Sequence, residues 1–352
     1  MTGSASGGCD FPTAERAGLA MLGGEDIITR FRGHPLRGHF WPAQPLDTAT
    51  EGATDNGLVI MCPGFTEFCE KHGGTCRALH ERGFDVLVID WPGHGRSGHF
   101  GRHPIAVHID SFEIYLEAMD HLLTAAGLAA RNDVFLFGHS MGGHLALRLA
   151  RRHRRHVRGV ILSAPMILPP VTPAAGVRLL AGCLCWLGWR RSFPPFHHVQ
   201  TLAKARQFHP DNVLSGWQPG FEAQFIWMDD QPTLRRSGPT VGWVRAAYAS
   251  CAATTMNPVW MRQLDVPVLA LTAGDERVVH KPSTDRMLTC LPSFAAHEIA
   301  GARHELLQES PAITARVWDL IDPFLERGRS RESFVNGLQN SDDSGVRPFT
   351  KW

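Results

Sequence analysis

Short apolar runs alternate with helix-like segments along most of the chain. Runs of aliphatic side chains and phenylalanine that suit buried strands occupy residues 58–62, 85–90, 134–137, 160–162 and 267–272. Helix-like segments lie between them, and the one at 112–126 has its apolar residues at helical spacing. Strands that alternate with helices predict a mostly parallel sheet covered by helices on both faces, which is the α/β class.

The two ends of this pattern are also informative. Residues 26–41 alternate between apolar and polar on both sides of a Gly-His-Pro turn, which predicts a β-hairpin before the first buried strand. Residues 295–299 are predicted to form a last strand, and residues 312–326 an amphipathic closing helix. The predicted sheet therefore gains a hairpin at its start and a helix at its end.

Residues 166–260 interrupt the alternation. They contain many prolines and tryptophans and no clear buried strand. Helical fragments are predicted at 177–189, 220–227 and 241–253. We interpret this stretch as a helical cap inserted into the α/β core.

The cap divides the chain into parts. The core is predicted to comprise residues 25–165 and 261–327. Residues 1–24 are rich in Gly and Ser and predict a flexible leader, and the polar residues 328–352 predict a disordered tail.

Composition excludes several classes of protein. The chain has 352 residues, a net charge of +1 and 43% hydrophobic residues, so the balance of charges does not predict a nucleic-acid partner. The eight cysteines are scattered and do not resemble a disulfide framework or a zinc site. We see no secretory signal, and no apolar run reaches the ~18 residues of a membrane span. A cytoplasmic location is expected, with peripheral membrane association as an open alternative.

One strand leads directly into a chemically suggestive turn. The apolar run 134–137 is followed by Gly138-His139-Ser140-Met141-Gly142, and good helix formers come next. Strand, G-x-S-x-G and helix form the nucleophile elbow of α/β-hydrolases, in which the serine occupies a strained turn. Side chains at Gly138 and Gly142 would collide with the neighbouring strand and helix. Ser140 is therefore the candidate nucleophile, and its alternative role is an ordinary helix cap.

A serine nucleophile needs a base, and the base needs an orienting acid. In α/β-hydrolases the acid and then the base follow the serine along the chain, each after a strand. Asp275 directly follows the run 267–272, and His304 follows the predicted strand 295–299, so we assign them as acid and base.

Other carboxylates and histidines compete for these roles. Glu276 could replace Asp275 but lies one position further into the loop. The remaining rivals are less well placed with respect to the predicted strands and helices, and they are Asp265, Asp285, His280 and His297.

The oxyanion that forms during acyl transfer needs two N–H donors. One is expected from Met141, the residue after the nucleophile. The other is expected from Phe65 in the loop after the run 58–62, where Gly64 lets the backbone approach closely. The sequence contains no H-E-x-x-H spacing, so we expect no metal and no cofactor.

Five sequence blocks together carry a family resemblance. They read CPGFTEFCEKHGG, DWPGHGRSG, GHSMGGHLALRLA, TAGDERVV and GARHELLQE, in this order. The chain resembles the monoacylglycerol lipase and lysophospholipase branch of the α/β-hydrolases, and bacterial lysophospholipase L2-like proteins in particular. This branch belongs to the same sequence family as serine aminopeptidases of the S33 type. The resemblance covers about residues 26–326 and is weakest in the cap.

The resemblance implies an α/β-hydrolase fold with Ser140, Asp275 and His304 as the triad, and with Phe65 and Met141 as oxyanion donors. One departure is that many members have His where this chain has Pro63. Further residues match the family blocks without a catalytic role that we can assign, and packing or capping explains them best; they are Glu67, Glu70 and Trp91.

The expected activity is hydrolysis of a small-molecule acyl ester, a lysophospholipid or a monoacylglycerol. Residues 177–189 are apolar nearly all round and have arginines at their edges. This helix either packs on the core or forms a lid that touches lipid. The alternatives are a proline-type aminopeptidase with Asp229 or Asp230 holding the amine, a general short-chain esterase, and a non-enzymatic binding protein.

Overall fold

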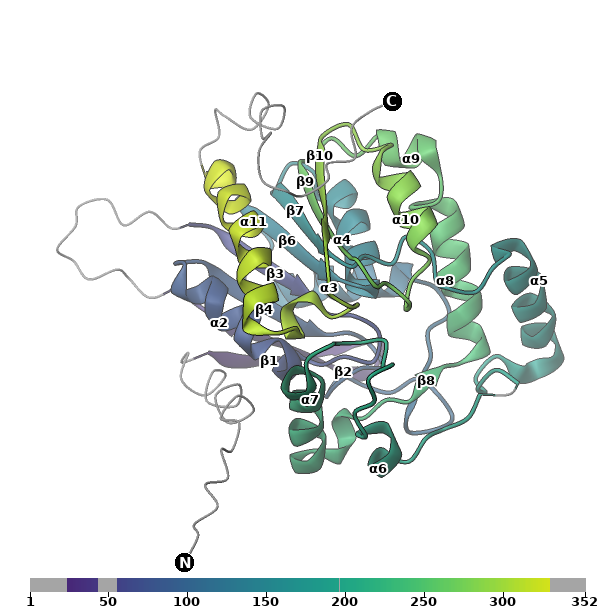
Figure 1. The fold of residues 1–352 in the computed structure, drawn as a ribbon. Coiled ribbons are helices and arrows are strands. Elements are labelled where there is room, and N and C mark those ends of the chain that lie inside the picture. The colour runs from purple at the N-terminus through teal and green to yellow at the C-terminus, as the bar shows by residue number, and fades with distance from the viewer. Residues whose placement is uncertain (1–23, 44–55, 196, 330–352) are drawn as a thin grey trace, which may run out of the picture.

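The computed structural model describes residues 24–43, 56–195 and 197–329. These residues form an eight-stranded sheet in the order β1-β2-β4-β3-β6-β7-β9-β10, flanked by helices (Figure 1). The six strands from β4 to β10 in this order are parallel, while β1 and β2 are antiparallel to their neighbours. The predicted α/β-hydrolase fold, with its mostly parallel sheet, is thus confirmed.

The strands agree closely with the apolar runs. Their bounds are β1 Glu25–Phe31, β2 His34–Trp41, β3 Leu58–Cys62, β4 Asp85–Asp90, β5 Ala106–Val107, β6 Val134–His139, β7 Val157–Ser163, β8 Gly238–Pro239, β9 Val268–Ala273 and β10 Phe294–Ile299. The predicted hairpin is formed by β1 and β2. Every residue of β3 and β9 is buried, because a parallel strand inside the sheet is covered on both faces.

Most of the helices lie where helical spacing predicts them, but the short helices at 202–205 and 258–262 were not predicted. Their bounds are α2 Gly73–Glu81, α3 Glu113–Ala125, α4 Met141–Arg152, α5 Ala174–Leu184, α6 Leu202–Ala205, α7 Gln218–Asp230, α8 Val241–Ala253, α9 Pro258–Arg262, α10 Lys281–Leu288 and α11 Pro311–Arg329. Short 3₁₀ turns occupy Cys69–His72, Pro232–Leu234 and Leu306–Gln308, and a π-helical turn occupies Cys185–Trp189.

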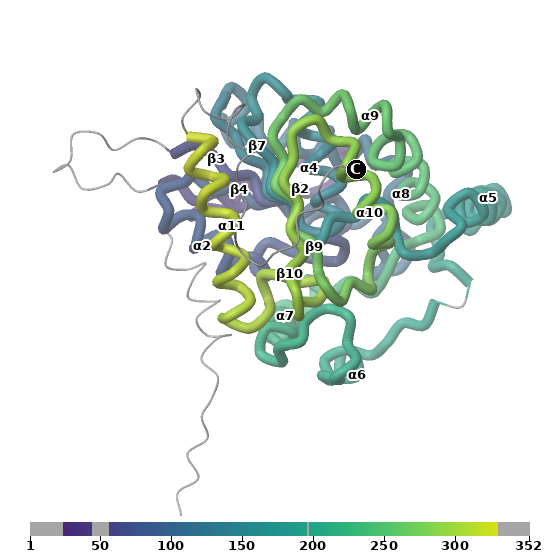
Figure 2. The backbone as a smooth tube through the Cα atoms, turned by 45° about the horizontal axis from the view of Figure 1, so that its top comes forward, coloured from purple at the N-terminus to yellow at the C-terminus, as the bar shows by residue number. Residues whose placement is uncertain are grey.

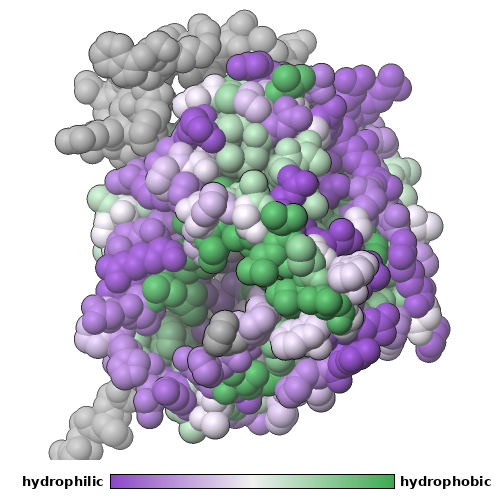
Figure 3. Space-filling model, turned by 90° about the vertical axis from the view of Figure 1, so that its right-hand side faces the viewer, coloured by the Kyte–Doolittle hydropathy of each residue, from purple (hydrophilic) through white to green (hydrophobic). Residues whose placement is uncertain are grey.

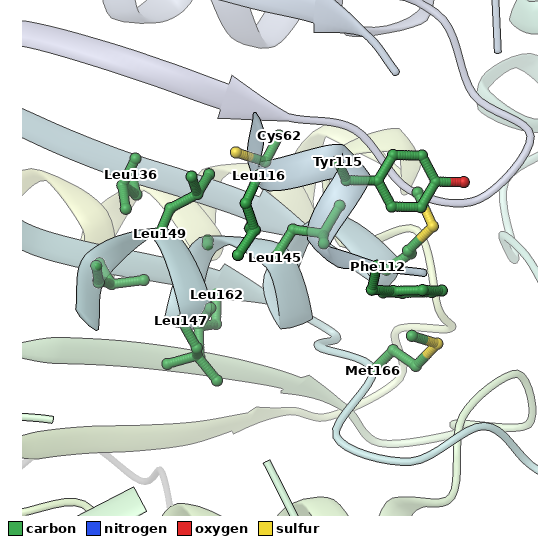
Figure 4. Packing of buried hydrophobic residues seen from close by; sticks show 14 of the residues in the cluster. Cys62, Phe112, Tyr115, Leu116, Leu136, Leu145, Leu147, Leu149, Leu162 and Met166 are labelled. Carbon is green, nitrogen blue, oxygen red and sulfur yellow. The ribbon is translucent and has the colours of Figure 1, made fainter. Parts of the chain in front are cut away.

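Two apolar clusters cover the two faces of the sheet. One packs α3 and α4 against β3, β6 and β7, and Figure 4 shows Leu145 and Leu149 of α4 beside Leu116 of α3 and Leu136 of β6. The other packs α2 and α11 on the opposite face, where the two helices lie side by side (Figure 2). Because helices pack on both faces of the sheet, the ends of its strands are held in place. The loops that follow these strands, which carry the candidate site residues, start from fixed positions.

The segment between β7 and β9 is mostly helical, as expected. It contains one short strand that the sequence did not reveal, β8, which pairs with β5 outside the main sheet. A two-residue bridge leaves no alternating pattern to detect. Thr240 caps the start of helix α8, because its hydroxyl accepts a hydrogen bond from the Trp243 N–H at 3.2 Å.

The predicted leader and tail lie almost entirely outside the described residues, and α11 extends to Arg329, two residues into the predicted tail. The seven cysteines within the described ranges all carry free thiols. Across those same ranges, no helix has the length and apolar character needed to cross a bilayer.

Candidate active site

Ser140 occupies a strained turn between β6 and α4. Its backbone lies at φ 52° and ψ −120°, a conformation that non-glycine residues rarely adopt. A Cβ on Gly142 would lie 1.8 Å from the carbonyl oxygen of Cys62, and one on Gly138 would lie 2.5 Å from that of Gly142. Both positions therefore require glycine, as the sequence pattern predicts, and the turn holds Ser140 at the carboxyl end of β6.

The carboxyl ends of three parallel strands bring the predicted residues to one edge of the sheet. Ser140 follows β6, while the loop at 274–279 follows β9 and His304 follows β10. His139, the neighbour of Ser140, places its ring centroid 5.0 Å from that of His304. Ser140 is 7% exposed and His304 is 3% exposed, so both lie in a largely water-excluded region.

His304 is paired with Glu276. Its Nδ1 lies 2.8 Å from Oε2 and 3.0 Å from Oε1 of this carboxylate. Because a carboxylate only accepts, Nδ1–H must donate, and Nε2 is left as the acceptor. The N–H groups of Val278 and Val279 also donate to Glu276 Oε1, at 2.7 and 3.2 Å. The Glu276 carboxylate is thereby held from two sides.

Asp275, the acid that we assigned from the sequence, does not contact His304. Its side chain is 41% exposed and accepts hydrogen bonds from Arg277 at 2.7 and 2.9 Å. Its backbone N–H donates to the carbonyl of Ala302, which orients the turn so that the carboxylate faces outward. The longer side chain of Glu276 points inward instead, so the structure pairs the base with the rival carboxylate.

The other rival residues take structural roles. Asp265 lies 3.7 Å from Arg154 at the surface, and Asp285 is paired with Lys281. The ring of His280 accepts from the Ser283 N–H at the start of α10. His297 is partly buried within β10, where burial lowers its pKa.

The loop after β3 carries the predicted oxyanion donor Phe65. The carbonyl oxygen of Pro63, two residues before Phe65, accepts a hydrogen bond from Trp91 Nε1 at 3.0 Å. The N–H of Gly64 donates to the Glu67 carboxylate. The Phe65 ring packs on Trp243 of α8, with centroids 4.3 Å apart. The loop is therefore held by the Trp91 hydrogen bond on one side and by the Trp243 ring on the other. Proline at position 63 still provides the backbone carbonyl that accepts the Trp91 hydrogen bond.

Met141 is the first residue of α4, directly after Ser140. The first N–H groups of a helix have no partner within it, and the helix dipole favours negative charge there. Such a donor suits an oxyanion. Within the described residues, no group of three His, Cys, Asp or Glu side chains is arranged to hold a metal ion.

Sequence reasoning missed the role of Glu67. Its family match was evident, but its surroundings were not, because it contacts Lys71 and His139, and Lys71 in turn contacts the distant Glu305. Only their convergence in space reveals a buried charged cluster behind the elbow.

Helix α5 lies against α8 and away from the sheet (Figure 1). Of its residues only Ala181 is buried. Figure 3 shows apolar side chains gathered beside a hollow on this face of the molecule. The exposed apolar residues on α5 and the π-helical turn that follows it are Leu179, Leu180, Trp186, Leu187 and Trp189. Ala174 and Val177 pack against the core, whereas most of the apolar surface of this helix and of the turn after it is exposed.

Comparisons with known proteins identify relatives of this chain. Lysophospholipase L2 of Escherichia coli strain K12 is 28% identical over 286 residues, which cover 78% of this chain and 81% of the relative. Monoglyceride lipase of Rattus norvegicus is 28% identical over 132 residues, covering 37% of this chain and 42% of the relative.

Solved structures show the same fold. A soluble variant of monoglyceride lipase from Saccharomyces cerevisiae superimposes with a TM-score of 0.65 at 17% identity, covering 86% of this chain and 95% of the other. Monoacylglycerol lipase from Paleococcus ferrophilus gives 0.61 at 21% identity, covering 83% and 99%. The family model described as serine aminopeptidase, S33, matches residues 53–311. The chain therefore belongs to the serine aminopeptidase S33 family and is a hydrolase with the α/β-hydrolase fold.

Proposed function

We propose that this protein is a serine esterase for monoacyl lipids, with Ser140 as nucleophile, His304 as base and Glu276 as orienting acid. The observation that carries the proposal is the pairing of His304 Nδ1 with Glu276 at 2.8 Å, on the same sheet edge as the strained Ser140 turn. An elbow serine together with a base already oriented by an acid is the arrangement that acyl transfer needs.

The proposed reaction has two halves. His304 Nε2 takes the proton of the Ser140 hydroxyl as its oxygen attacks the ester carbonyl. The N–H groups of Phe65 and Met141 stabilise the oxyanion, and the alcohol leaves with the proton from His304. Water, activated by His304, then cleaves the acyl-enzyme and releases the fatty acid. Glu276 stabilises the imidazolium that forms in both halves.

The lipid part of the proposal is supported by the cap, for which we propose residues 166–260. Leu179 is 71% exposed and Trp186 is 86% exposed, and arginines 178, 190 and 191 flank them. Apolar side chains bordered by cations suit a bilayer surface, where tails and phosphates lie in adjacent layers. We propose that this face contacts the membrane from which a monoacyl lipid enters the site. The free cysteine thiols fit a reducing, cytoplasmic setting.

A second candidate is an aminopeptidase, because the family description carries that name. This activity would need a buried carboxylate for the free amine of the substrate. Asp229, one of the two residues that we considered, is 49% exposed and paired with Arg206. The esterase proposal is therefore preferred.

An activity panel tests the proposal. Purified protein and a Ser140→Ala variant are assayed on lysophospholipids, monoacylglycerols, short soluble esters and aminoacyl anilides. We expect long monoacyl lipids to turn over fastest and Ser140→Ala to be inactive and unlabelled by a fluorophosphonate. Residual labelling of Ser140→Ala would remove the nucleophile assignment, and faster cleavage of aminoacyl anilides would favour the peptidase.

A further inference from the structure

A chain of buried charges lies behind the nucleophile elbow. Lys71 Nζ is 2.9 Å from Glu67 Oε1 and 2.5 Å from Glu305 Oε1. All three side chains are 7% exposed or less. We call Glu67, Lys71 and Glu305 the buried bridge.

The charges of the bridge are maintained by one another. Burial alone would lower the pKa of Lys71, but the carboxylates of Glu305 and Glu67 outweigh it and raise that pKa. Burial alone would raise the pKa of Glu67, but the Lys71 ammonium beside it holds that pKa well below its ordinary range. Lys71 and Glu67 are thus charged, although buried ion pairs are often no more stabilising than apolar residues of similar size. Stability alone gives a weak reason for it.

One end of the bridge holds the oxyanion loop. Besides Lys71, the Glu67 carboxylate accepts a hydrogen bond from the Gly64 N–H, directly before Phe65. A Cβ on Gly64 would lie 2.8 Å from Glu67 Oε2, so the carboxylate packs closely under the loop. His72 Nε2 lies 2.9 Å from the same oxygen. Glu67 therefore fixes the position of the backbone at Gly64, and with it the position of the next residue, the proposed oxyanion donor Phe65.

The other end reaches the segment of the base. Glu305 directly follows His304, and its backbone N–H donates to the carbonyl of Leu214 at 2.8 Å. Lys71 thereby connects the segment of the oxyanion loop to the segment of the base, which lies 234 residues later in the chain.

His139 connects the bridge to the base through space. Its Nε2 is 3.6 Å from Glu67 Oε1, and its ring faces that of His304 at 5.0 Å. Burial lowers the pKa of His139 to about 3, so this ring is neutral at working pH. The groups that face His304 are then Glu276, the neutral His139 and, beyond it, the bridge and His72. Arg303 donates instead to backbone carbonyls and lies 3.7 Å from Asp275.

We infer that Glu67, Lys71 and Glu305 are positioning residues, which keep the oxyanion loop in register with His304 and set the electric field at the base. The inference rests on the proposed function and adds residues that do not touch the substrate. The two carboxylates attract the positive charge that His304 gains during the proposed reaction, and the Lys71 ammonium repels it. In a poorly screened interior each charge acts over several ångströms.

The test compares single variants that remove one charge each. With a short soluble ester, Glu67→Gln and Glu305→Gln should move the acidic midpoint of kcat/KM to lower pH, and Lys71→Met should move it to higher pH. Each shift should be about one pH unit. We expect kcat to fall about 10- to 100-fold in each variant, with KM nearly unchanged. Opposite shifts are not expected if the residues merely stabilise the fold.

A triple variant covers the case in which single charges left unpaired prevent folding. Glu67→Gln, Lys71→Met and Glu305→Gln together bury no charge and should fold as stably as the wild type. We expect this variant to lose kcat while keeping its Tm. Arg82→Met is the control, because it removes the Arg82–Asp322 ion pair between α2 and α11 and should leave kcat unchanged.

The outcomes separate the two proposals. Wild-type kcat and pH midpoint in the folded triple variant would overturn the inference about the bridge while leaving the esterase in place. Labelling of Ser140→Ala by the fluorophosphonate would overturn the proposed site itself, and the bridge with it.

Discussion

His304 donates a hydrogen bond from Nδ1 to Glu276, 2.8 Å away, and both side chains are 3% exposed. Asp275, one residue earlier, is turned to solvent and to Arg277. Two adjacent carboxylates in the same loop thus have different surroundings, and only one can orient the base.

The first prediction separates these carboxylates. Glu276→Gln should lower kcat by about 10³–10⁴-fold, because an amide can hold the base in the wrong tautomer. Asp275→Asn should stay within about threefold of wild type, because exposed ion pairs contribute little. Steady-state kinetics on a soluble ester, with matched circular dichroism spectra, provide the measurement. Greater loss in Asp275→Asn than in Glu276→Gln would restore Asp275 as the acid.

The second prediction concerns the elbow. Gly142→Ala should destabilise the protein by at least about 3 kcal/mol, because its Cβ would meet the Cys62 carbonyl at 1.8 Å. Gly182→Ala in α5 is the matched control, since a Cβ there meets nothing within 4 Å. It should stabilise α5 by about 0.5–1 kcal/mol. Urea unfolding measures both, and equal stabilities of the two variants would contradict the steric argument.

The third prediction tests the cap surface. Trp186→Ser combined with Leu187→Ser should weaken binding to phospholipid vesicles by at least about tenfold, since each side chain loses about 1.5–3 kcal/mol of apolar burial. Cleavage of soluble esters should not change. Ile28→Ser on β1 is the control, because Ile28 is 71% exposed but lies outside the cap. Cosedimentation with vesicles is the measurement, and unchanged binding of the double variant would refute membrane contact through this face.

The fourth prediction concerns pH and stability. Burial lowers the pKa of His94 to about 4 and that of His139 to about 3, and burial with Arg148 nearby lowers that of His144. Below pH 6.5 the unfolded chain therefore binds protons that the folded protein does not, so stability falls as pH falls. Each histidine contributes a slope of about 1.4 kcal/mol per pH unit.

This slope is measured by urea unfolding between pH 6.5 and 5. The variant His144→Gln should reduce it by one histidine's contribution, because its partners, the hydroxyls of Ser250 and Thr255, can still bond to an amide. An unchanged slope would mean that His144 is already charged in the folded protein.

The sequence by itself determined the long elements of the core and several residues of the proposed site. Buried parallel strands need unbroken apolar runs, so β3, β4, β6 and β9 could be located, and the order of strands and helices then gave the fold class. Gly138 and Gly142 marked the elbow because no other side chain fits there. The loop after β10 identified His304, since the end of a strand is a property of the local sequence.

The tertiary structure alone decided what depends on side-chain direction and on distant partners. The choice of Glu276 over Asp275 follows from a turn in which the Asp275 N–H donates to the Ala302 carbonyl and the Val278 N–H donates to the inward Glu276 carboxylate. The exposure of α5 depends on its packing against α8. Because the sequence of this helix is apolar on nearly all sides, its pattern does not indicate which side is buried. Glu67 and Lys71 lie four residues apart, a spacing that is equally typical of an exposed ion pair. Their burial and the third member, Glu305, which lies 234 residues after Lys71, became evident only in the folded protein.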